Sequence, residues 1–184
     1  LGPAGETASR LSADEVVYDP GSLLFTVPGH VRVEADGVVL EGDSFDYDKA
    51  NGLFGTTAGG VFSSKTMSGR AAEVLYTEGT DEVRLAGGVR VELTAAGRTG
   101  ERVVLTCDSF TYGRRDHRGI ATGRTEFSEG RWRGEARSIS IAATEDESGL
   151  ESAGLDGTAR VLLSGGGSGG SESGEVRADR VRVA

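Results

Sequence analysis

The chain has few of the residues that fix a structure covalently or anchor it in a membrane. It contains one cysteine, Cys107, so an internal disulfide framework is excluded. No apolar run approaches the roughly 18 residues that a membrane span needs, and the first residues, L-G-P-A-G-E, do not form a signal peptide. The two histidines, His30 and His117, have no ligand-spaced partners, so no metal site is predicted.

Positive charge is also scarce. The chain carries 29 acidic and 20 basic residues, for a net charge of −9, which argues against nucleic acid as a partner. The arginines of R-R-D-H-R at 114–118 are interleaved with acids nearby, which indicates a mixed surface rather than a phosphate-binding patch. A length of 184 residues with 36% hydrophobic residues suits one domain or one elongated repeat array.

All four tyrosines end copies of one phrase: a small residue, an acid in three of the four copies, any residue, an apolar residue, any residue, tyrosine. Successive phrases begin 29, 29, 36, 29 and 42 residues apart, which is typical of an internal repeat. Ile141 and Val183 replace tyrosine in the last two copies, so the slot requires an apolar or β-forming side chain and not a hydroxyl. The six phrases are A-D-E-V-V-Y at 13–18, G-D-S-F-D-Y at 42–47, A-A-E-V-L-Y at 71–76, C-D-S-F-T-Y at 107–112, A-R-S-I-S-I at 136–141 and A-D-R-V-R-V at 178–183.

Each phrase alternates with period two, the pattern of a strand with one buried face. A turn and two further short strands complete each unit, and no segment shows a helical period, so the chain is predicted to be all β. Leu40 and Gly42 have a parity that Phe45 and Tyr47 do not share, which predicts a bulge or corner near Gly42. The predicted turns are 19–21, 49–52 and 78–81; the second strands are 29–34, 87–93 and 123–128; the third strands are 38–42, 66–69, 102–107 and 131–134.

The domain boundaries follow from composition. Residues 1–10 are predicted to be a disordered N-terminal segment, and residues 11–184 a single domain. The Gly- and Ser-rich run at 164–174 is predicted to be a flexible loop, and 142–149 has a similar linker composition.

Two sets of side chains that could be reactive are predicted to have structural roles instead. Cys107 takes the small-residue slot of its phrase, which indicates a buried, unreactive thiol. The acids Asp14, Asp43, Asp108 and Asp179 share one repeat slot, which favours turn capping or solvent exposure, since catalysis needs different residues converging at one place. We therefore predict no catalytic residue, no cofactor and no enzymatic activity.

The order of these motifs resembles the lipopolysaccharide-transport β-jellyroll family, which comprises LptC, LptA and the N-terminal periplasmic domain of LptD, also called OstA-like domains. The resemblance covers roughly residues 11–141. It is greatest to LptC, through V-V-L-E-G-D-S-F-D-Y-D at 38–48, T-T-A-G-G-V at 56–61 and T-M-S-G-R-A-A-E-V-L-Y at 66–76.

This resemblance implies an elongated, slightly twisted open β-jellyroll of about 15 short antiparallel strands, with an apolar lumen that carries lipopolysaccharide acyl chains through the periplasm. It implies as partners lipopolysaccharide or a related lipid, an inner-membrane lipopolysaccharide ABC transporter, and like jellyroll proteins or further copies of the chain joined edge to edge. The anchor expected of LptC is not in the sequence given. The side chains predicted to face the lumen are Val16, Tyr18, Phe45, Tyr47, Val74, Tyr76, Phe110, Tyr112, Ile139 and Ile141. The predicted edge-pairing residues are Val16, Tyr18, Val181 and Val183.

A parallel β-helix remains the alternative at this stage, either as an adhesin-like structural protein or as a polysaccharide-processing enzyme. Units of about 29 residues also suit a solenoid coil. The two folds differ in strand direction, because a β-helix stacks equivalent strands in parallel whereas a jellyroll pairs neighbouring strands antiparallel.

Overall fold

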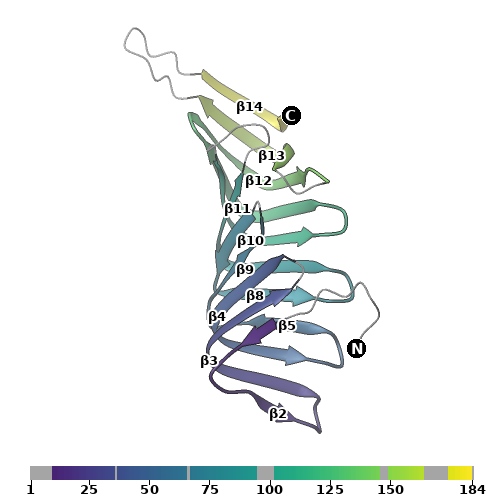
Figure 1. Cartoon of the computed structure of the whole chain (residues 1–184). Helices are drawn as coiled ribbons and strands as arrows, with labels where there is room; N and C mark the ends of the chain where they lie inside the picture. The colour runs from purple at the N-terminus through teal and green to yellow at the C-terminus, as the bar shows by residue number, and fades with distance from the viewer. Residues whose placement is uncertain are drawn as a thin grey trace.

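The computed structural model describes residues 10–35, 37–65, 67–94, 102–145, 149–163 and 174–183, and all regular structure within these ranges is β-strand. Fourteen strands form one open sheet, stacked along a long axis from β2 to β14 (Figure 1). Every pairing in this part of the chain is antiparallel, which confirms the all-β open jellyroll and rules out the parallel β-helix.

The strands are longer than the sequence pattern predicts, because pairs of expected short strands are halves of single bent strands. The predicted strand 38–42 and the phrase 42–47, for example, are one strand of 11 residues. The strands are β1 (Arg10–Ser12), β2 (Val17–Asp19), β3 (Leu24–Ala35), β4 (Val38–Asp48), β5 (Leu53–Thr56), β6 (Gly60–Ser63), β7 (Met67–Ala71), β8 (Glu73–Thr77), β9 (Glu82–Thr94), β10 (Arg102–Gly113), β11 (Arg118–Glu129), β12 (Trp132–Ala143), β13 (Leu150–Leu163) and β14 (Gly174–Val183).

The N-terminal boundary moves by one residue, since β1 begins at Arg10, the last residue of the segment expected to be disordered. Residues 1–9 lie outside the described residues, as do 146–148 of the predicted linker and 164–173 of the predicted loop. Gly174, predicted to close that loop, begins β14.

A line of β-bulges bends the long strands. Gly29 and His30 of β3 face the single residue Asp43 of β4, and Gly87 and Gly88 of β9 face Asp108 of β10. The first residue of each bulge has a positive φ, 84° at Gly29 and 79° at Gly87, which glycine adopts without the strain that a Cβ would cause. Equivalent register shifts occur between β11 and β12 and between β13 and β14. The corner predicted near Gly42 is thereby confirmed, and it repeats along the molecule.

The bulges divide the sheet into two facing walls. β4 pairs with β6 before its corner and with β5 after it, and β9 likewise pairs with both β7 and β8. Wall A consists of β1, β6, β7 and residues 31–35, 38–42, 89–94, 102–107, 125–129, 132–136, 159–163 and 174–178. Wall B consists of β2, β5, β8 and residues 24–28, 44–48, 82–86, 109–113, 118–122, 138–143, 150–156 and 180–183.

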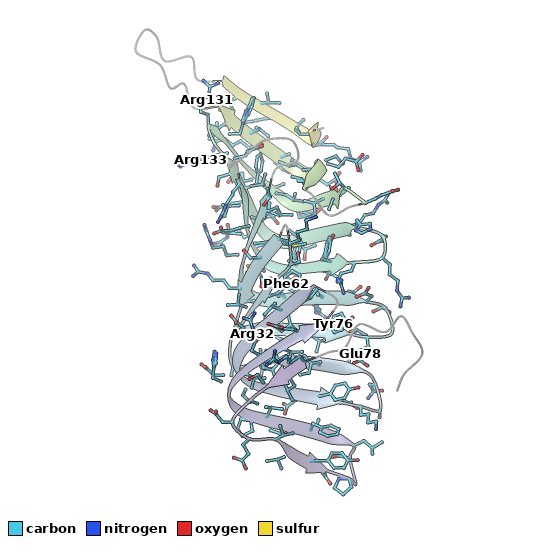
Figure 2. The ribbon with its side chains drawn as sticks, viewed as in Figure 1. Arg32, Phe62, Tyr76, Glu78, Arg131 and Arg133 are labelled. Atoms are coloured by element: carbon cyan, nitrogen blue, oxygen red, sulfur yellow. The ribbon has the colours of Figure 1, made fainter. Side chains whose placement is uncertain are left out.

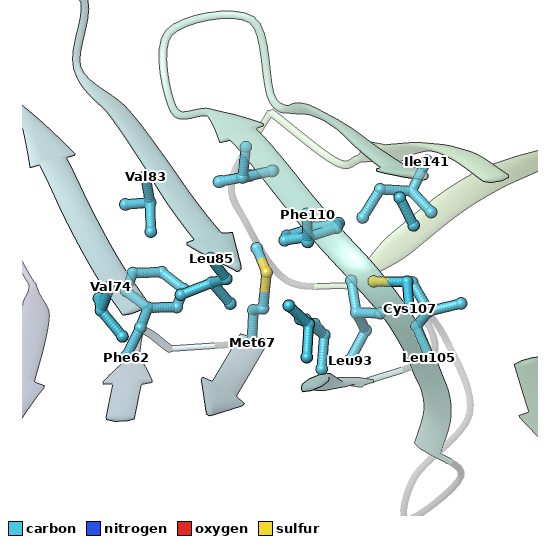
Figure 3. Packing of buried hydrophobic residues seen from close by; sticks show 14 of the residues in the cluster. Phe62, Met67, Val74, Val83, Leu85, Leu93, Leu105, Cys107, Phe110 and Ile141 are labelled. Atoms are coloured by element: carbon cyan, nitrogen blue, oxygen red, sulfur yellow. The ribbon is translucent and has the colours of Figure 1, made fainter. Parts of the chain in front are cut away.

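The core is a cluster of buried hydrophobic side chains between the walls, and Figure 3 shows part of it. One row of wall B next to the corner shows this packing. Leu85 is the cross-strand neighbour of both Val74 and Phe110, and Ile139 lies two strands beyond Phe110, across Ala121. All five side chains are fully buried. Each of the larger four contributes roughly 1.5–3 kcal/mol of transfer free energy on burial. The row that contains the tyrosine slot lies two residues further from the corner along each strand.

Candidate functional site: an apolar cavity at the N-terminal end

A cavity of about 340 Å³ opens between the two walls at the N-terminal end of the sheet. Both walls contribute apolar side chains to it, and the segment between β1 and β2 adds Val16. Wall A contributes Leu11, Val33, Val38 and Leu40; wall B contributes Phe25, Val27, Tyr47, Phe54 and Tyr76; Arg10, Glu78 and Arg114 complete the lining.

An aromatic ladder runs along wall B, formed by Tyr18, Phe25, Tyr47, Phe54 and Tyr76, and all of its members except Tyr18 line the cavity. Each is the cross-strand neighbour of the next, from β2 through β3, β4 and β5 to β8. The ring centroids are 4.4 Å apart for Tyr18 and Phe25, 5.8 Å for Phe25 and Tyr47, and 6.3 Å for Tyr47 and Phe54, within the range of favourable aromatic pairs. The ladder is therefore a continuous apolar surface with hydroxyl groups at its outer margin.

Two of these hydroxyl groups, those of Tyr47 and Tyr76, bond to a polar rim in the turn that follows β8, where Glu78 lies (Figure 2). The Tyr47 hydroxyl donates to Glu78 over 3.3 Å, and the Tyr76 hydroxyl donates to Asp81 over 3.0 Å. Asp81 also accepts from Arg114 Nη1 at 3.0 Å. Burial raises the pKa of Tyr47 and of Tyr76, and the neighbouring carboxylates of Glu78 and Asp81 respectively raise each pKa further. Both phenols consequently remain protonated hydrogen-bond donors at neutral pH.

The ten residues predicted to face the lumen fall into three groups. Val16, Tyr47 and Tyr76 line the cavity. Tyr18 stacks on Phe25 at the sheet edge, and it is 45% exposed because β2 pairs with no strand other than β3 among the described residues. The other six lie in the closed core and are buried: Phe45, Val74, Phe110, Tyr112, Ile139 and Ile141.

The predicted edges lie at the two ends of the sheet. Within the described residues β2 pairs only with β3, and β14 pairs only with β13. Val16 precedes β2 rather than lying in it, so its backbone is outside the ladder. Val181 pairs opposite Leu155 and is half-buried, and the Val183 backbone pairs opposite Ala153.

Several cavity residues do not appear among the sequence predictions, notably Phe25, Phe54 and Val33. A signal for two of them is present in the sequence, because Phe25 and Phe54 each follow a tyrosine of the phrase by seven residues, across the turn. Val33 lies in a predicted strand, but its wall could be assigned only once the corner had been placed. The sequence pattern identified the tyrosines of the ladder and missed the two phenylalanines that lie between them.

The structure agrees with a structural role for Cys107 and for Asp108. Cys107 is 5% exposed, and burial, with a smaller effect of the Asp108 carboxylate, raises its pKa to about 11, so the thiol is protonated and shielded. Asp108 Oδ2 accepts the backbone N–H of Arg124 at 3.1 Å, which caps the corner between β10 and β11. Asp108 therefore stabilises a bend, whereas Asp14, Asp43 and Asp179 of the same slot are exposed.

The described part of the chain offers neither a metal site nor a membrane-spanning helix. It contains no group of three or more His, Cys, Asp or Glu residues placed to hold a metal ion. None of its elements is a helix long and apolar enough to cross a membrane.

Comparisons with known proteins give matches among solved structures only. No protein-family model matches the sequence, and no curated protein matches it. Among solved structures, the chain is similar to the crystal structure of LptH, the LptA-homologous periplasmic component of the lipopolysaccharide transport device from Pseudomonas aeruginosa. The sequence identity is 14% and the TM-score 0.35, over 77% of this chain and 85% of that chain. We draw no functional conclusion from a similarity of this size.

Proposed function

We propose that the protein is a non-enzymatic lipid-binding scaffold that holds acyl chains of lipopolysaccharide, or of a related lipid, between its two walls. The apolar cavity at the N-terminal end carries this proposal, because aliphatic side chains of wall A face the aromatic ladder of wall B there. Each methylene group moved from water into such a site stabilises the complex by about 0.8 kcal/mol. The motif order shared with the lipopolysaccharide-transport family supports this choice of lipid.

The same resemblance supports a location and partners. The scaffold would act in the periplasm and pass lipid from an inner-membrane ABC transporter toward the outer membrane. Its end strands, β2 and β14, present backbone groups that can pair with a like jellyroll protein or with a second copy. Proline at Val181 would remove one backbone donor from β14, so V181P is expected to weaken such association in size measurements while the central strands stay folded.

Lipid binding is tested by placing one charge inside the cavity and the same charge outside it. Val33 lines the cavity on wall A, so a V33E substitution puts a carboxylate where acyl chains would lie. Val61 is exposed on β6 and pairs opposite Arg70, so V61E is the matched control. Binding of purified lipopolysaccharide, measured by displacement of a fluorescent lipid, should be lost in V33E and kept in V61E. Equal binding by both variants would contradict the proposal.

A further inference from the structure

The apolar cavity does not continue into the middle of the molecule. On wall A its lining ends at Leu40, whose cross-strand neighbour is Phe62 of β6. On wall B its apolar lining ends at Tyr76, whose neighbour is Val83 of β9. Phe62 and Val83 are both fully buried, so packed side chains replace the open space one strand further along.

A contact between the walls closes the interior at this point. Leu85 belongs to wall B, and its Cδ1 lies only 2.6 Å from where a Cβ on Gly69 of wall A would be. Gly69 is in turn the cross-strand neighbour of Phe62. Figure 3 shows Phe62 and Leu85 within the packed cluster. The absence of a side chain at Gly69 lets Leu85 reach the opposite wall, so Phe62, Gly69 and Leu85 form an end wall.

The size of the cavity limits what it can hold. Its volume of about 340 Å³ is at the lower end of the roughly 300–1,000 Å³ of small-molecule pockets. A space of this size, with apolar side chains on both walls, has room for one alkyl chain, so it would hold one acyl chain of a lipopolysaccharide molecule at a time.

We infer that the cavity is a blind site for a single acyl chain and that the end wall sets the longest chain it accepts. This inference rests on the proposed lipid binding and adds a specificity to it. A chain that enters from the N-terminal end gains affinity with each methylene group until its terminal methyl meets Phe62. Further methylene groups stay in water and add nothing.

The test is a homologous series of straight-chain alkyl phosphates, with affinity for the folded protein measured by displacement of a fluorescent lipid. In the wild-type protein, affinity should rise by up to about fourfold per methylene group and then level off. F62L enlarges the end of the cavity and should move this limit to longer chains. V33F fills the cavity from wall A and should move the limit to shorter chains.

F110L is the matched control for F62L, because Phe110 is another fully buried phenylalanine that does not line the cavity. It should leave the limit unchanged. A limit that stays fixed in F62L and V33F while all the proteins bind would overturn the blind site and leave lipid binding intact. Affinity that rises without a limit in the wild-type protein would do the same. Absence of alkyl phosphate binding by the wild-type protein would overturn both proposals.

Discussion

The N-terminal end and the centre of the molecule use the same repeat slot with different results. At the N-terminal end, Tyr47 pairs across strands with Phe54, and space remains between the walls in front of them. In the centre, Tyr112 pairs with Gly119, and the space above the glycine is filled by Phe110 and Ile141. A Cβ on Gly119 would lie 2.8 Å from the Phe110 ring and 2.9 Å from Ile141. The same repeat slot therefore borders a cavity where space remains between the walls, and a closed core where neighbouring side chains fill that space.

The largest effect should come from removing one aromatic ring from each region. F110A leaves a cavity in the closed core and should lower the free energy of unfolding by about 3–5 kcal/mol. F25A removes a half-buried ring that borders an existing cavity, and should cost only about 1–2 kcal/mol. Denaturant unfolding of both variants measures the difference. Equal losses would show that the N-terminal end is packed as tightly as the centre.

A smaller effect is expected where the two walls touch. A methyl group added by G69A would clash with Leu85, so overpacking should cost about 1–3 kcal/mol. Gly79 lies in a turn without a positive φ, and nothing lies within 4 Å of the place that a Cβ would take there. G79A is therefore the control and should stay within about 0.5 kcal/mol of wild type. If G69A unfolds at the wild-type denaturant concentration, Leu85 does not close the interior.

The buried thiol of the centre predicts a dependence on pH. The pKa of Cys107 is about 11 in the folded chain against an ordinary value of 9.0, so folding favours the protonated thiol. Its contribution to stability is therefore complete below about pH 9 and is lost as the pH rises through 11. C107A should lose stability less steeply than wild type across this window, by at most about 2–3 kcal/mol. Parallel pH profiles would mean that the thiol is solvated.

The smallest effect concerns two tyrosine hydroxyls of the ladder. Y76F removes the hydrogen bond to Asp81 and should cost about 0.5–1.5 kcal/mol in thermal or denaturant unfolding. For Tyr18, no hydroxyl partner occurs within the described ranges, so Y18F should be close to neutral. A neutral Y76F would show that the hydrogen bond from Tyr76 to Asp81 does not stabilise the fold.

Period-two alternation and the repeated tyrosine phrase were sufficient to predict an all-β chain, and the change of parity between Leu40 and Phe45 located its corner. They did not decide strand direction, since the antiparallel pairing was implied only by the family resemblance and a parallel β-helix stayed open. Strand lengths were not predictable in this way, because a bulge leaves the strand on both sides of it hydrogen-bonded and the sequence shows only an interruption. The cavity was also beyond the sequence pattern. Tyr47 and Tyr112 occupy equivalent slots, and only the positions of Phe54 and Gly119 relative to the opposite wall decide which of them lines open space.

Lipid binding between the walls is tested most directly by a photo-crosslinking comparison of three positions. A photoreactive phenylalanine analogue would replace Phe54 in the cavity, Phe110 in the closed core, or Asp46 on the outer face of β4, and the folded protein would be irradiated with lipopolysaccharide. We expect a lipid adduct at position 54 and little or none at positions 110 and 46. Equal adducts at positions 54 and 110 would contradict a cavity confined to the N-terminal end, and equal adducts at 54 and 46 would contradict binding between the walls.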